Sequence, residues 1–168
     1  MKIAYVTSPN RGETDQLLAD VAEKLQGGGT ALAGIVKALG YASGFANGCD
    51  MKLRVLPEGP VIKITQDLGS GSDACRLDPS AIANAVATVE SGSLGNADLF
   101  ILNKFGPEEA AGRGFCNMIG TALDHGIPVL VGVGGASKPA FETFAGGLAT
   151  ALPPDAQAIF DWCKLETP

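Results

Sequence analysis

Residues that could bind or react with a ligand are concentrated directly after one apolar run. Residues 99–102 (Leu-Phe-Ile-Leu) are long enough for a buried strand, and Asn103 and Lys104 follow at once. A bend and a charged segment with Glu109 and Arg113 come next. Open α/β sheets bind ligands at the carboxyl ends of their strands, where ammonium and guanidinium groups can hold oxyanions. The stretch therefore predicts a ligand site, with Lys104 and Glu109 as the catalytic candidates.

A second set of candidates lies near the amino terminus, where a strand, a loop and a helix follow one another. The phosphate-binding Walker A pattern is G-x-x-x-x-G-K-[ST]. Residues 7–14 keep its second glycine (Gly12) and its hydroxyl (Thr14), but Glu13 replaces its lysine. The start of a helix still attracts anions through its N–H groups and dipole. The predicted phosphate ligands are Arg11, Gly12, Thr14, Asn103, Lys104 and Arg113, and the candidates for Mg²⁺ are Asp15 and Glu109.

Residues 50–66 predict a β-hairpin, because two runs that alternate apolar and polar residues flank the turn Pro57-Glu58-Gly59-Pro60. A four-residue loop would place Arg54 opposite Lys63, and like charges in that position repel. Either this edge is solvated, or an anion or an acidic part of the protein lies between the two cations. The predicted secondary anion or thiol site comprises Cys49, Arg54, Lys63, Cys75 and Arg76, with buried free cysteines as the alternative.

Strands and helices alternate along the chain around these candidates. Apolar periodicity predicts strands near 2–7, 30–38, 99–102, 127–133 and 148–152, with helices beginning near 14, 79, 139 and 155 and one in the second half of 108–125. A strand, a helix and a strand in succession form a βαβ unit with parallel strands. We therefore predict a single α/β domain over 1–168, with three layers, a mainly parallel sheet and a hairpin insertion after the second strand.

Composition limits the possible functions. The chain has 168 residues, of which 46% are hydrophobic and 18% charged, so it can bury a core. Its net charge of −6 argues against general nucleic-acid binding. The cysteines form no C-x-x-C pair, and the single His125 lies at a helix end, so zinc and His-rich metal sites lack support. No apolar run approaches ~20 residues and no signal peptide is evident, which predicts a cytoplasmic protein that does not insert into membranes.

The sequence resembles a bacterial family of unknown function that is often found beside molybdenum-transport genes. The matching motifs are Asp15-x-Leu17-Leu18-Ala19, Gly34-x-Val36, Cys49-Asp50-Met51-x-Leu53-Arg54-x-Leu56-Pro57-x-Gly59, Cys75-Arg76-Leu77-Asp78, Asn103-Lys104-Phe105-Gly106, Glu109-Ala110-x-Gly112-Arg113-Gly114-Phe115 and Ala140-Phe141. They are spread over nearly the whole chain.

More distantly, the chain is similar to the small P-loop nucleoside triphosphatases of thermophiles. The resemblance implies a P-loop-NTPase-like architecture. Their Walker B segment coincides with this chain at Gly106, Glu109 and Phe115, but its catalytic Asp-Glu pair falls on Asn103 and Lys104. That pair binds Mg²⁺ and activates water, which an amide and an ammonium do poorly. Glu13 and Lys104 either pair and close the site, or Lys104 takes over phosphate binding.

The leading functional hypothesis is an accessory or regulatory protein that binds a nucleotide or an oxyanion in a degenerate P-loop site without efficient hydrolysis. The ligand would be a nucleotide with Mg²⁺ or, through the resemblance alone, molybdate or tungstate. One alternative is an active NTPase or nucleotide-dependent phosphotransferase that uses Asp15 or Glu109 for Mg²⁺. A second is an interaction module without a ligand. A protein partner or a homo-oligomer is compatible with each hypothesis.

Overall fold

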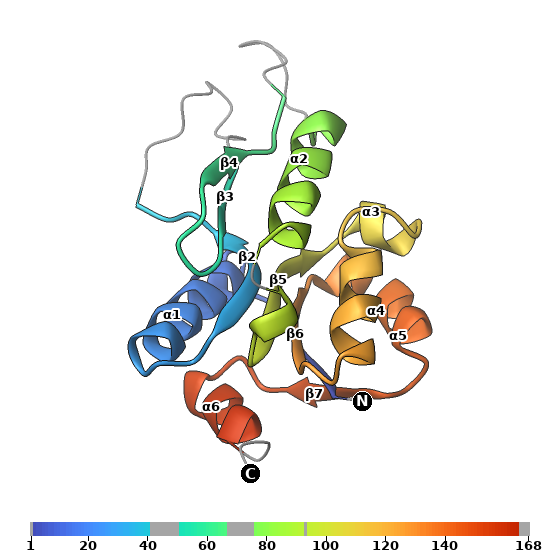
Figure 1. Ribbon diagram of the computed structural model, residues 1–168. Coiled ribbons are helices and arrows are strands. Elements are labelled where there is room, and N and C mark those ends of the chain that lie inside the picture. Colours follow the sequence, from blue (N-terminus) through green and yellow to red (C-terminus); the bar gives the residue numbers. More distant parts are fainter. Residues whose placement is uncertain (1, 41–50, 67–75, 93, 165–168) are drawn as a thin grey trace.

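A mixed sheet of seven strands organises the described part of the computed structural model, which comprises residues 2–40, 51–66, 76–92 and 94–164 (Figure 1). The strands are β1 (Ile3–Val6), β2 (Leu32–Lys37), β3 (Lys52–Val55), β4 (Val61–Lys63), β5 (Leu99–Phe105), β6 (Val129–Val133) and β7 (Ala149–Leu152). The α-helices are α1 (Glu13–Gly27), α2 (Pro79–Glu90), α3 (Pro107–Ala110), α4 (Cys116–Asp124), α5 (Lys138–Ala145) and α6 (Ala156–Lys164). Short 3₁₀ turns are η1 (Leu94–Asn96) and η2 (Gly135–Ser137).

The strand order is β4-β3-β2-β5-β6-β1-β7. The strands from β2 to β7 in this order run parallel, whereas β3 pairs antiparallel with both β2 and β4. The predicted parallel orientation of β1 and β2 is confirmed, although β5 and β6 lie between them. The parallel order brings the carboxyl ends of β1, β2, β5 and β6 to one edge of the sheet, where the candidate residues follow their strands.

Helices cover both faces of the sheet and confirm the predicted three-layer α/β class (Figure 1). One face packs against the buried residues of α1 and α6, which include Leu18, Val21 and Ile159. The other face packs against α2, α4 and α5. Buried strands such as β5 are apolar on both sides because each of their faces meets a helix layer. Within the described ranges, no helix is both long enough and apolar enough to span a bilayer.

Helix α2 begins where the sequence predicted it. The Asp78 side chain accepts hydrogen bonds from the backbone N–H groups of Ser80 and Ala81, and Pro79 occupies the first helical position. This cap satisfies N–H groups that have no partner inside the helix. The Asp78 N–H also donates to Ile64 O at 2.7 Å, which holds the start of α2 beside the hairpin.

The hairpin forms after β2 as predicted, but its predicted register is wrong. Arg54 lies opposite Val61, and Lys63 lies opposite Lys52. The predicted register, with Arg54 opposite Lys63, would also pair Leu56 with Val61. The Leu56 N–H instead donates to Gly34 O in β2 at 3.0 Å, and its side chain is buried in the α1-side core. The Arg54–Lys63 pairing that supported a secondary anion site is therefore absent, and Cys49 and Cys75 lie outside the described residues.

Candidate functional site

A cavity of about 420 Å³ lies at the carboxyl ends of β2 and β5, bounded by the hairpin, the first turn of α2 and α3. Its apolar wall comprises Ile35, Met51, Leu53, Ile64, Leu77, Ile82, Pro107 and Phe115. Its polar lining comprises Arg11, Lys37, Thr65, Asn103, Lys104, Gly106, Glu108 and Glu109. This is the edge of the sheet at which the sequence analysis expected a ligand site, and the site itself stays a prediction. Of the predicted ligands, Arg11, Asn103 and Lys104 line this cavity.

Asn103 joins three elements at the base of the cavity, and only 3% of it is exposed. Its Oδ1 accepts a hydrogen bond from the backbone N–H of Lys37 at 3.0 Å, and its Nδ2 donates to Asp15 Oδ1 at 2.9 Å. Lys37 Nζ lies 3.3 Å from Asp15 Oδ2. The amide thus ties β5 to β2 and α1, and both carboxylate oxygens of Asp15 are engaged. Sequence reasoning missed Lys37, whose only signal was its position at the end of β2.

Lys104 is exposed and lines the cavity beside the loop that follows β6, where its side chain reaches the vicinity of Gly134. Within the described part of the chain it has no acidic partner. The ion pair that we considered between Lys104 and Glu13 is not formed in this structure. The Glu13 carboxylate instead accepts hydrogen bonds from the Ser8 hydroxyl and, at 3.1 Å, from Asn10 Nδ2. Glu13 therefore forms hydrogen bonds within the turn after β1 rather than with Lys104, so Lys104 remains available to an anion.

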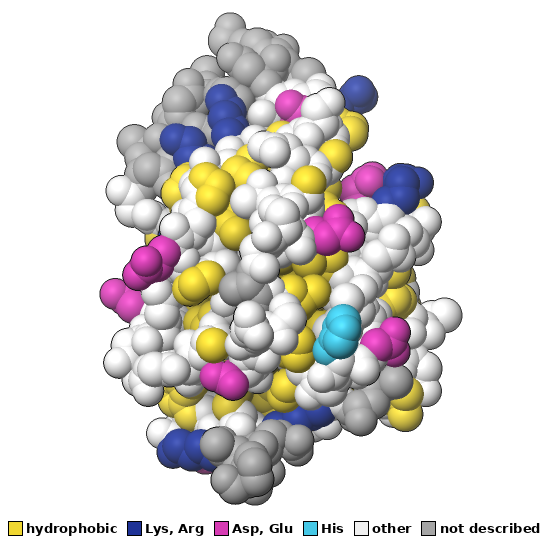
Figure 2. Space-filling model, viewed as in Figure 1, with side chains coloured by type: hydrophobic (Ala, Val, Ile, Leu, Met, Phe, Trp, Pro, Cys, Tyr) yellow, Lys and Arg dark blue, Asp and Glu magenta, His cyan; other side chains and the backbone are white. Residues whose placement is uncertain are grey.

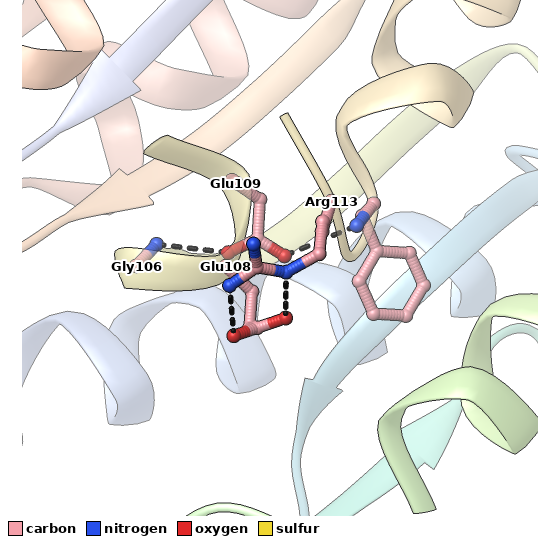
Figure 3. A network of polar contacts seen from close by, with 5 residues as sticks. Gly106, Glu108, Glu109 and Arg113 are labelled. Atoms are coloured by element: carbon pink, nitrogen blue, oxygen red, sulfur yellow. Dashed lines mark hydrogen bonds and ion pairs between the residues drawn. The ribbon is translucent and has the colours of Figure 1, made fainter. Parts of the chain in front are cut away.

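Glu109 is buried, with 7% exposed, and its carboxylate holds the backbone around α3 (Figure 3). Its Oε2 accepts from the Gly106 N–H at 3.0 Å, and its Oε1 accepts from the Phe115 N–H at 3.1 Å. Burial raises the pKa of the Glu109 carboxyl, while these hydrogen bonds act in the opposite direction. Because both oxygens already accept hydrogen bonds from the protein, the geometry favours a structural role over Mg²⁺ binding.

Arg113 forms a two-pronged hydrogen bond with Glu108, in which Nε and Nη2 each lie 3.0 Å from a carboxylate oxygen (Figure 3). This contact lowers the pKa of Glu108. The Arg113 side chain is 65% exposed and lies outside the lining of the 420 Å³ cavity. Its predicted role as a phosphate ligand therefore stays a prediction, and its guanidinium is already neutralised by a carboxylate.

The turn after β1 supplies Arg11 to the cavity and starts α1. Gly12 occupies the position before the helix with φ of 78°, a left-handed conformation that glycine adopts without strain. Arg11 is exposed and has no acidic partner among the described residues. Thr14 lies in the first turn of α1 and is half-buried, outside the cavity lining. Of the residues that the sequence analysis proposed in this turn, Arg11 alone lines the cavity.

Of the remaining secondary-site candidates, Arg54 and Lys63 lie diagonally on the same face of the hairpin, because Lys63 lies opposite Lys52 and Arg54 opposite Val61. Arg76 is exposed, and its carbonyl oxygen accepts a hydrogen bond from the Gln66 N–H. Across the described ranges, no group of three or more His, Cys, Asp and Glu side chains is placed to hold a metal ion. The face shown in Figure 2 carries acidic side chains scattered among apolar ones, with Lys and Arg side chains mainly near its upper and lower ends. These observations leave the cavity at the sheet edge as the better supported site.

Comparisons with known proteins agree with this architecture. The sequence profile of a family described as "Protein of unknown function (DUF2478)" matches residues 3–162. The chain belongs to the DUF2478 family.

A relative named molybdenum import ATP-binding protein ModC 2, from Bradyrhizobium diazoefficiens, is 36% identical over 165 residues. The match covers 97% of this chain but 18% of that protein, so the chain spans less than a fifth of its relative's length.

The fold is similar to that of a human cancer-related nucleoside triphosphatase whose solution structure is known. The two structures superpose with a TM-score of 0.70 and 13% sequence identity, over 100% of both chains. At this identity the likeness concerns the fold alone. It confirms the P-loop-NTPase-like architecture that the sequence predicted.

Proposed function

We propose that this DUF2478 protein is an accessory or regulatory protein that binds a nucleotide or a small oxyanion without efficient hydrolysis. One observation supports it above others. Among the described residues, the two Mg²⁺ candidates Asp15 and Glu109 have both carboxylate oxygens engaged by donors of the protein itself, whereas Arg11 and Lys104 have no acidic partner. Within the described part of the chain, the site therefore offers cations to an anion, while the carboxylates of Asp15 and Glu109 are already occupied by protein donors.

The arrangement around Asn103 argues against hydrolysis. P-loop NTPases use acidic side chains after the corresponding strand to hold Mg²⁺ and position the attacking water. Here the Asn103 amide is fixed by Lys37 and Asp15, and the next residue, Lys104, carries a positive charge that repels Mg²⁺. Converting Asp15 or Glu109 into a metal ligand would break hydrogen bonds that connect secondary-structure elements. This is why we favour binding over the alternative of an active NTPase or phosphotransferase.

Local charge supports anion binding despite the net charge of −6. Arg11 and Lys104 approach the cavity from the loop after β1 and from β5, and Lys37 lies beside them in contact with Asp15. Cations that converge on a concave surface attract an anion more strongly than the molecular net charge suggests. A nucleotide is also consistent with the ATP-binding name of the relative and with the fold of the structural neighbour.

The molybdenum connection also comes from the relative, which is named for molybdenum import and contains a segment similar to this chain within a much longer protein. We propose that the present chain acts in the cytoplasm beside a molybdenum transport system. Molybdate or tungstate could then occupy the cationic rim as the oxyanion. A transport component would be the partner whose activity responds to the bound ligand.

Isothermal titration calorimetry tests this proposal with ATP, ADP, phosphate, molybdate and tungstate, each with and without Mg²⁺. We expect at least one of them to bind, and Lys104→Ala to weaken that binding about tenfold by removing a charge-assisted contact. Lys24→Ala is the matched control, because Lys24 is a cation in the last turn of α1, remote from the cavity.

Phosphate release from ATP and GTP is measured in the same preparations and should remain at the level of the buffer. Mg²⁺-dependent turnover that survives in Lys104→Ala would instead identify an NTPase with a shifted set of groups. If none of these ligands binds, the interaction-module hypothesis replaces the proposal.

A further inference from the structure

The cavity is larger than a tetrahedral oxyanion requires. A water molecule takes up about 30 Å³ of liquid, so an anion with four oxygens would fill only a small part of about 420 Å³. Cavities that enclose organic molecules begin at roughly 300 Å³. The volume therefore fits an organic ligand of moderate size.

Apolar side chains from separate elements form most of the wall. Leu53 and Ile64 come from the hairpin region, Ile35 from β2, Ile82 from α2 and Phe115 from the turn before α4. Each of these residues is at most 9% exposed, so the wall is built into the core. A bare oxyanion gains no binding free energy from contact with an apolar wall. A flat apolar ring does, because it covers the wall and removes apolar surface from contact with water.

Thr65 adds a polar contact within this apolar wall. It lines the cavity and is 7% exposed, and its Oγ1 accepts a hydrogen bond from the Met51 N–H at 3.0 Å. The hydroxyl can also donate its own proton, and no described residue accepts it. A buried donor without an acceptor is costly, so the cavity favours a ligand whose apolar body carries an acceptor atom.

The cations lie at one side of this wall. Arg11 and Lys104 reach the lining from the loop after β1 and from the end of β5, whereas the hairpin side of the lining is apolar apart from Thr65. A ligand that satisfied both parts would combine a heterocyclic ring with one anionic group. Two unpaired cations are matched by a single phosphate, which carries a charge between −1 and −2 near neutral pH.

We infer that the cavity binds an aromatic heterocycle with a single phosphate group, the chemistry shared by nucleoside monophosphates and phosphorylated cofactors. The ring lies against the wall formed by Leu53, Ile64 and Ile82, an acceptor atom of the ring faces Thr65, and the phosphate meets Lys104 and Arg11. This inference rests on the proposed function and names the ligand class of the same site.

Calorimetric titrations with AMP, GMP, UMP, flavin mononucleotide and pyridoxal 5′-phosphate test the inference, and they separate nucleotides from other phosphorylated heterocycles. Inorganic phosphate and molybdate serve as comparison ligands without a ring, and adenosine serves as a comparison ligand without a phosphate. At least one monophosphate should bind about tenfold more tightly than inorganic phosphate and than its own dephosphorylated form. Binding by the cofactor phosphates alone assigns the site to a cofactor and still supports the inference.

Variants locate the ring. Thr65→Val should weaken monophosphate binding about fivefold to tenfold through the lost hydrogen bond, leave phosphate binding unchanged, and be rescued by Thr65→Ser. Because Thr65→Val also removes the acceptor of the Met51 N–H, Ile82→Phe serves as a second variant that fills the cavity without touching a hydrogen bond. It should exclude the ring ligand and spare inorganic phosphate, with circular dichroism confirming the fold of each variant.

The possible failures differ. If phosphate or molybdate binds as tightly as every monophosphate, and both variants leave all affinities unchanged, the inference is overturned while the proposed function stands. If a dephosphorylated ring compound binds as tightly as its phosphate, the inference fails because the cations contribute nothing. If no anion of either set binds, the proposed function and the inference fail together.

Discussion

Glu109 is a carboxylate in a candidate catalytic position that the structure uses to hold its own backbone. Its two oxygens join the N–H groups of Gly106 and Phe115, and so they close the segment that contains α3. Gly114 makes this possible, because its φ of 57° turns the chain and a methyl group at this position would overlap Glu109 Oε1. The glycine, rather than the acid alone, explains why the segment retains this shape.

Gly114→Ala should therefore reduce the free energy of unfolding by about 2–4 kcal/mol, the sum of left-handed backbone strain and the disturbed hydrogen bonds of Glu109. Gly112→Ala is the matched control. Gly112 has φ of 80° but open space around the added methyl group, so its substitution should cost only about 1 kcal/mol. Urea denaturation of both variants measures the difference, and equal losses would contradict this account of Glu109.

At the scale of elements, Asn103 connects β5 with β2 and α1 through the Lys37 N–H and Asp15. The fold places this residue at the carboxyl end of a central strand, at the position that the sequence resemblance aligned with an acid of the Walker B segment. An amide suits the structure better here because it donates to Asp15 and accepts from Lys37 at the same time. A carboxylate would accept from Lys37 but would repel Asp15.

Asn103→Asp should destabilise the protein by about 1–3 kcal/mol at neutral pH, because two carboxylates would face each other across a contact that is now 2.9 Å. The double variant Asn103→Asp with Asp15→Asn exchanges the two groups and should recover most of the loss. Chemical denaturation of the single and double variants measures the coupling. Equal stability of Asn103→Asp and the unaltered protein would show that the contact is dispensable.

At the scale of the whole molecule, the central strands belong to both hydrophobic cores at once. Tyr5 faces the core covered by α2, α4 and α5, whereas its neighbours Ala4 and Val6 face the core covered by α1 and α6. Neither helix layer can therefore detach from the sheet without exposing one apolar face of the central strands to water. This arrangement couples the two cores in unfolding.

We expect one cooperative unfolding transition with the same midpoint by two probes. Far-ultraviolet circular dichroism reports on all helices, whereas the fluorescence of Trp162, the only tryptophan of the chain, reports on α6 and its contact with Lys2. A lower midpoint by fluorescence would show that α6 detaches before the sheet unfolds, and so would contradict the coupling of the two layers.

Local patterns predicted the elements and the edge of the sheet at which the cavity lies. The apolar run before Asn103, the helix start at Asp78-Pro79 and the strand near 127–133 are properties of neighbouring residues, and hydrophobic periodicity records them directly. The same reasoning placed Arg11 and Lys104 together at the carboxyl ends of strands, since parallel strands end at a common edge. Type and order of the elements thus followed from the sequence.

Tertiary structure alone decided which partner each polar side chain has. Glu109 could bind Mg²⁺ or hold two backbone amides, and the choice depends on the distance to Gly106 and Phe115 after folding. Lys37 entered the site only because β2 lies beside β5, and the hairpin register depended on Leu56 reaching Gly34. Periodicity carries information about burial, whereas hydrogen-bond partners and cavities arise from contacts between residues far apart in the sequence. The sequence by itself therefore determined the layers and the edge at which we expect the site, and the folded arrangement determined the contacts of the candidate residues.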